Sequence, residues 1–115
     1  MPYLEGFVAA VPTANKDAYV KHAEEAVEYF KELGATRVVE GWGDDVPRGE
    51  VTDFYRAVQA KDDESIVFSW IEYPDKETRD AANEKMASDP AAAEMEMPFD
   101  GKRMFFGGFV PLLDR

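Results

Sequence analysis

The segment from Ser65 to Tyr73 constrains the fold of this chain more than any other. It is rich in β-branched and aromatic residues, follows a polar turn and ends at Pro74, a pattern that predicts a β-strand. Side chains alternate between the faces of a strand, which gives Ile66, Phe68 and Trp70 on one face and Val67, Ile71 and Tyr73 on the other. Because both faces are apolar, we expect both to be covered.

The flanking segments predict three more strands and two long helices. The strands are expected at Tyr3–Ala10, Thr36–Trp42 and Arg103–Val110, and the helices at Asn15–Leu33 and Asp75–Ser88. Thr13 or Asn15 is expected to cap the first helix, Gly34 to follow its end in a left-handed conformation, and Asp75 to cap the second helix. Residues 53–58 and 91–97 favour short helical turns.

This order of elements predicts one α+β domain over residues 1–115, a ferredoxin-like βαββαβ plait. Right-handed crossovers place both helices on one face of the sheet, so the other face stays open. The first and last strands, like the third, are apolar on both sides. We therefore expect a homodimer that closes the two sheets into a dimeric α/β barrel. A monomer whose tail and long loop fold across the sheet is the alternative.

The net charge of −11, from 24 acidic and 13 basic residues, argues against a nucleic-acid partner. The chain has no cysteine, which excludes disulfides and thiolate metal sites. No signal peptide or stretch long enough to span a bilayer is recognised, so we expect no membrane partner and a cytoplasmic location.

Several short motifs occur together in one order along nearly the whole chain. They are Glu5-Gly6-Phe7-Val8, Gly43-Asp44-Asp45-Val46-Pro47, Phe68-Ser69-Trp70-Ile71, Arg79-Asp80, Asp89-Pro90 and Met97-Pro98-Phe99-Asp100-Gly101-Lys102-Arg103-Met104. In these motifs and in their order, the chain resembles the YbaA-like family of uncharacterised small bacterial proteins. The resemblance implies the dimeric α/β barrel superfamily, which includes small monooxygenases and haem-degrading enzymes, but it supplies no catalytic residue.

Two residues are candidates for catalysis. His22 is the only histidine and lies near the apolar stripe of the first helix, where an imidazole can act as a base or as a haem ligand. A partly buried, locally satisfied histidine is the alternative. Asp44, beside Asp45, stands in a loop bounded by glycine and proline, where a carboxylate serves as acid or base or simply as a turn residue. We expect no metal site and no cofactor.

Six further residues are candidates for ligand binding. Trp42, Trp70 and Tyr73 are suited to lining a pocket for a flat apolar molecule, although aromatic residues in such strands usually form core or interface. Arg79, Asn83 and Met86 have helical spacing that brings them to one pocket edge, with Arg79 holding a carboxylate. An exposed pair between Arg79 and a neighbouring aspartate is the alternative.

These observations leave two hypotheses for function. The first is a dimeric protein without a defined activity that binds a small apolar molecule or a protein partner. The second is a cofactor-free enzyme, similar to a monooxygenase or isomerase, that acts on a small aromatic or carbonyl compound with His22 or an aspartate as base.

Overall fold

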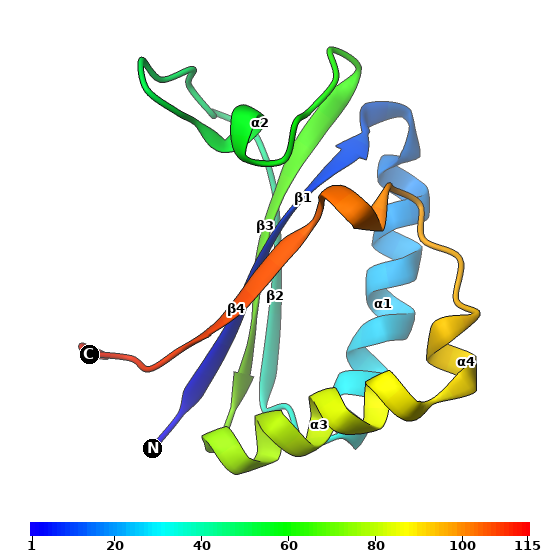
Figure 1. Ribbon diagram of the computed structural model, residues 1–115, viewed down its shortest axis with the longest axis vertical. Helices are drawn as coiled ribbons and strands as arrows, with labels where there is room; N and C mark the ends of the chain where they lie inside the picture. Colours follow the sequence, from blue (N-terminus) through cyan, green and yellow to red (C-terminus); the bar gives the residue numbers. More distant parts are fainter.

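A computed structural model describes all residues, 1–115, and shows a four-stranded antiparallel sheet in the order β2-β3-β1-β4 (Figure 1). The strands are β1 (Tyr3–Pro12), β2 (Arg37–Trp42), β3 (Glu64–Tyr73) and β4 (Phe105–Phe109). The helices are α1 (Lys16–Glu32), α2 (Phe54–Ala57), α3 (Lys76–Ser88) and α4 (Pro90–Ala93), with 3₁₀ turns η1 (Thr13–Asn15) and η2 (Gly101–Arg103). This is the predicted ferredoxin-like α+β fold, and the sheet of one chain remains open.

The central strands are longer than the sequence indicates. β1 runs two residues beyond Ala10, through Val11 and Pro12, because β3 pairs with it over ten positions, from Tyr3 opposite Tyr73 to Pro12 opposite Glu64. Proline is tolerated at the end of the strand, where its missing N–H costs no interior ladder bond. The other boundaries lie within two residues of the predicted ones, except that α4 ends at Ala93, four residues before the predicted end of the turn at 91–97.

The ends of the helices differ in how well the sequence predicts them. Asp75 caps α3 as expected, since its Oδ1 accepts a hydrogen bond from the Thr78 backbone N–H at 2.8 Å. Gly34, with a φ of 108°, takes the expected left-handed conformation after α1. The predicted side-chain cap of α1 is wrong: the Asn15 Nδ2 donates instead to the carbonyl of Pro98, at 2.9 Å.

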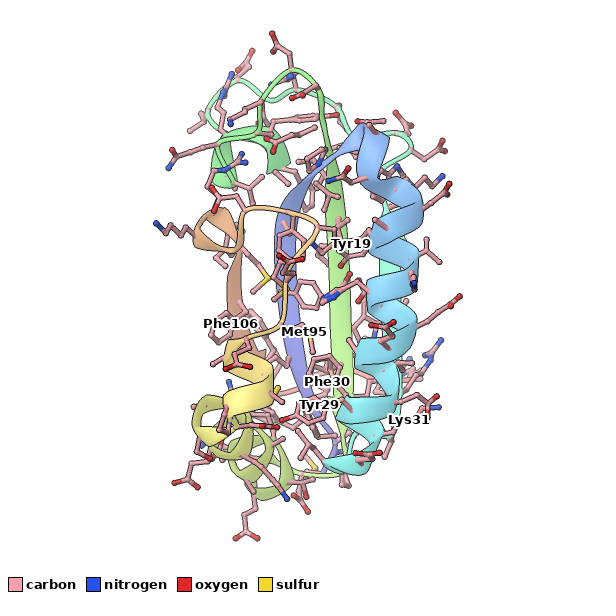
Figure 2. All side chains as sticks on the ribbon, turned by 90° about the vertical axis from the view of Figure 1, so that its right-hand side faces the viewer. Tyr19, Tyr29, Phe30, Lys31, Met95 and Phe106 are labelled. Atoms are coloured by element: carbon pink, nitrogen blue, oxygen red, sulfur yellow. The ribbon has the colours of Figure 1, made fainter.

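The two long helices cover one face of the sheet, which we call the helix side (Figures 1 and 2). Its core consists of Val11, Tyr19 and Val67 at one end and of Ala35, Ile71, Tyr73 and Ala82 at the other. No helix of the chain combines the length and the apolar composition that crossing a bilayer requires.

The opposite face, the open face, carries no long helix. The loop after β2, which contains α2, folds over one end of it (Figure 1). There Val8, Ala10, Val58 and Ile66 form a small buried cluster. The rest of the open face is not covered by the chain itself.

Candidate functional site

Three phenylalanine side chains stand on the uncovered part of the open face. The strand register places Phe105 beside Val8, Phe109 beside Leu4 and Phe68 beside Gly41, all on this face. Phe68, Phe105 and Phe109 are 51%, 47% and 59% exposed. At about 200 Å² for each side chain, they leave roughly 300 Å² of aromatic surface in water. An apolar patch of this size is typical of an interaction surface.

A hollow of about 350 Å³ lies at the end of the open face near α2, and we call it the open-face hollow. Its wall is mostly apolar and is made by Val39, Gly41, Trp42, Gly43, Val46, Phe54, Ile66, Phe68 and Trp70. Three of its rings pack edge to face, with centroids 5.9 Å apart for Phe54 and Phe68 and 6.2 Å apart for Phe68 and Trp70. Its size and lining suit a small apolar molecule.

The indole of Trp70 is held in a fixed direction in this wall. Its Nε1 donates a hydrogen bond to Glu72 Oε2 at 2.9 Å, and the same oxygen lies 3.3 Å from Arg37 Nη1. The sequence correctly places Trp70 on the same face as Ile66 and Phe68, because alternation along a strand is strictly local.

The α2 side of the hollow is anchored by Asp53. Its carboxylate accepts hydrogen bonds from the backbone N–H groups of Arg56, at 2.8 Å, and Gly49, at 3.1 Å. These backbone donors, the Arg56 N–H first, lower the pKa of Asp53, so it keeps its charge at neutral pH. The Tyr55 hydroxyl donates to the carbonyl of Val46 at 3.0 Å, and the Arg48 guanidinium lies 4.0 Å from the centre of the Tyr55 ring. The loop wall is therefore held at several points.

Two of the predicted ligand-binding residues meet on the helix side, far from this hollow. Arg79 donates from Nε and Nη2 to both carboxylate oxygens of Glu5, at 3.1 Å each, and from Nη1 to Asp80 at 2.9 Å. Tyr73 is fully buried nearby, and its hydroxyl makes no hydrogen bond. Burial first, and then the charge of Glu5, raise the pKa of Tyr73 to about 12.

The carboxylate that Arg79 holds thus comes from the chain itself. The helical spacing of Arg79 with Asn83 and Met86 does not point to Glu5 as its partner. The available signal was an acidic residue at an inward position of a strand that is otherwise apolar on that face, which demands a buried cation opposite it.

The remaining candidates are dispersed. His22 is partly buried on α1, and its ring lies 6.3 Å from that of Tyr19 and 6.4 Å from that of Phe99. Asp44 is exposed in the loop after β2, while Asn83 and Met86 are partly buried on α3. Of the eight candidates, only Trp42 and Trp70 line the open-face hollow, and only Tyr73 and Arg79 gather around Glu5. No three His, Asp or Glu side chains lie close enough together to hold a metal ion.

Comparisons with known proteins agree with the fold and with the resemblance. The chain is 59% identical to "Uncharacterized protein YbaA" of Escherichia coli strain K12 over 116 residues, covering 99% of each chain, and to YbaA of Shigella flexneri to the same extent. A solved dimeric ferredoxin-like protein from an uncultured marine organism matches the full length of both chains with a TM-score of 0.58 and 12% identity. Residues 2–101 match the family described as "Protein of unknown function (DUF1428)". The chain therefore belongs to the DUF1428 family.

Proposed function

We propose that the protein is a homodimer, joined through the open face, that binds a small apolar molecule in the open-face hollow. The observation that carries this proposal is the exposed apolar surface of the open face. There Phe105 and Phe109 of β4 lie on one side of β1 and Phe68 of β3 on the other, and Phe68 also lines the hollow. A second copy of the chain supplies the missing cover, and it turns two open sheets into a dimeric α/β barrel.

The open face suits a two-fold partner because one apolar patch is enough to build both sides of such an interface. In the alternative, a monomer whose tail and long loop fold across the sheet, the tail supplies no cover, because Leu112 and Leu113 are 98% and 73% exposed. The loop covers only one end of the open face (Figure 1). The similar marine protein is described as dimeric, which is consistent with the proposal at the level of the fold.

The hollow suits a flat apolar ligand because aromatic rings from two distant parts of the chain line it. Phe54 comes from α2, whereas Phe68 and Trp70 come from β3. Rigid aromatic rings offer a large contact area with little loss of conformational entropy. A second copy on the open face would close the side of the hollow that now faces water, which strengthens binding of an apolar group.

The alternative of a cofactor-free enzyme has no comparable support. His22 makes no hydrogen bond with another side chain, and its ring packs near those of Tyr19 and Phe99. It lines neither the open-face hollow nor a second hollow between α1 and β2. A base needs a polar partner or a substrate within hydrogen-bonding reach. Asp44 lies outside both hollows as well.

Light scattering after size exclusion tests the dimer, and a fluorescent neutral probe, N-phenyl-1-naphthylamine, tests the hollow. We expect a mass of about twice 12.9 kDa and one probe bound per protomer. Phe54→Ala, in the exposed short helix, is expected to weaken probe binding at least tenfold, whereas Phe106→Ala, on the helix side, should leave it unchanged. A monomeric mass refutes the dimer, and equal binding by both variants refutes the hollow as the site.

A further inference from the structure

A second hollow lies on the helix side, between α1 and the edge strand β2, and we call it the α1–β2 groove. Its volume is about 350 Å³. Valine and alanine side chains form its floor and flank, among them Val20, Ala23 and Val27 of α1. Three charged residues, Lys16, Glu24 and Glu40, also line it, which gives the groove an excess of one negative charge.

Glu40 is the fixed polar group of this groove. One of its oxygens, Oε1, accepts hydrogen bonds from the Tyr19 hydroxyl at 2.7 Å and from the Ser69 hydroxyl, and both of these residues are buried. Burial first, and then the charge of Glu40, raise the pKa of Tyr19, so the phenol keeps its proton and remains a hydrogen-bond donor. The other oxygen, Oε2, makes no hydrogen bond or ion pair within the chain.

Trp42 stands two residues beyond Glu40 and therefore on the same face of β2, about 7 Å along the strand. Its ring already receives a cation, because the Lys16 ammonium lies 5.6 Å from the ring centre. Lys16 is exposed at the start of α1 and makes no ion pair. Its ammonium is held there only weakly, and another cation can replace it.

We propose that the α1–β2 groove binds a small organic amine, with its ammonium group between Glu40 Oε2 and the Trp42 ring and its apolar body along Val20, Ala23 and Val27. A carboxylate held by two buried hydroxyls needs little reorganisation to receive a cation, and the indole face adds a cation–π attraction. The net charge of −11 favours the approach of cations over anions. This site is separate from the open-face hollow, although Trp42 borders both.

The test uses three probes with similar bodies and different charges: 2-phenylethylammonium, 2-phenylethanol and 3-phenylpropionate. In the Trp70→Phe protein, Trp42 is the only tryptophan. Its ring lies on the helix side, 6.3 Å from that of Tyr19, so its fluorescence reports binding at this groove. We expect the ammonium compound to bind at least tenfold more tightly than the alcohol and the carboxylate not to bind. This comparison needs no substitution in the groove itself. Equal affinity for the ammonium compound and the alcohol would overturn the proposal.

A matched pair of substitutions separates Glu40 from general electrostatics. In the same background, Glu40→Gln keeps an acceptor for Tyr19 and Ser69 but removes the charge, and we expect at least a tenfold loss of amine affinity. Glu25→Gln removes the same charge from an exposed position of α1 outside the groove, and we expect less than a twofold change. Lys16→Gln, which removes the competing ammonium, should raise the affinity severalfold. Equal effects of the two glutamine variants would contradict the proposed site.

Discussion

Arg79 and Glu5 join the helix layer to the sheet through a two-pronged ion pair, with Nε and Nη2 of Arg79 each 3.1 Å from a Glu5 oxygen. The Glu5 and Arg79 side chains are 7% and 15% exposed. A pair in this position ties α3 to the central strand β1. Removing one partner of this pair would leave the charge of the other buried and uncompensated.

Arg79→Met is expected to lower the free energy of unfolding by about 3–5 kcal/mol, because Glu5 then stays buried without a counter-charge. Urea unfolding at a fixed protein concentration measures the loss. Lys76→Met is the matched control on the same helix: Lys76 pairs with Asp80 at the surface, and its loss should leave the urea midpoint nearly unchanged. Similar losses in both variants would mean that the buried pair contributes no more to stability than the exposed pair.

Gly108 is expected to tolerate a side chain less well than its neighbour Gly107. A methyl group on Gly108 would overlap the Tyr3 hydroxyl and Arg79 Nη2, whereas on Gly107 it would rest at 3.6 Å from the Phe109 ring. Gly108→Ala should therefore destabilise the protein by about 1–3 kcal/mol, and Gly107→Ala by less than about 0.5 kcal/mol. Thermal unfolding followed by circular dichroism distinguishes the two, and the reverse order would contradict this account.

The sequence predicts local features of this molecule well and non-local ones poorly. Alternation in β3 places Phe68 and Trp70 on one face, because side-chain direction in a strand depends on residue spacing alone. Asn15 fails as a cap because the backbone of Pro98, 83 residues away, takes its side chain. No sequence pattern links two residues that are so far apart along the chain.

The residues of the candidate site show the same difference between local features, which the sequence predicts, and non-local ones, which it does not. Trp70 and Tyr73 are three residues apart, and an odd spacing in a strand sends them to opposite faces. They were thus never able to line one pocket within a single sheet face. The pairing of Glu5 with Arg79 joins residues 74 positions apart, and only the crossover of α3 over β1 brings them together.

Stability in acid is expected to depend on Glu64, which accepts hydrogen bonds from Nη1 and Nη2 of Arg103 at 2.6 Å each. These bonds are the first cause that lowers the pKa of Glu64 below its ordinary value of about 4.5. A lowered pKa in the folded state stabilises the protein above that ordinary value, and the stabilisation is lost as the pH falls through the folded pKa.

Urea midpoints measured from pH 7 to pH 3 test this dependence. Glu64→Gln should be less stable at pH 7 and should lose less stability between pH 5 and pH 3 than the unchanged protein does. Asp62→Asn is the control, since Asp62 is an exposed neighbour that forms no hydrogen bond or ion pair; its pH profile should run parallel to that of the unchanged protein. A parallel profile for Glu64→Gln would show that another carboxylate causes the loss of stability in acid.

Phe105 and Phe106 provide the sharpest test of the proposed dimer, because they are adjacent in β4 and point to opposite faces. Phe105 pairs with Val8 on the open face, and Phe106 pairs with Phe7 on the helix side, where Figure 2 shows it at the edge of the sheet. Both are already well exposed in one chain, at 47% and 63%, so a charge at either position should leave the fold intact.

Phe105→Glu is expected to raise the dimer dissociation constant at least a hundredfold. Each copy loses the burial of one phenylalanine, worth about 1.5–3 kcal/mol, and two carboxylates would enter an apolar interface without partners. Phe106→Glu adds the same charge to the same strand and should leave the dimer unchanged. Sedimentation equilibrium of both variants measures the two constants. If Phe106→Glu dissociates the dimer and Phe105→Glu does not, the copies meet through the helix side instead.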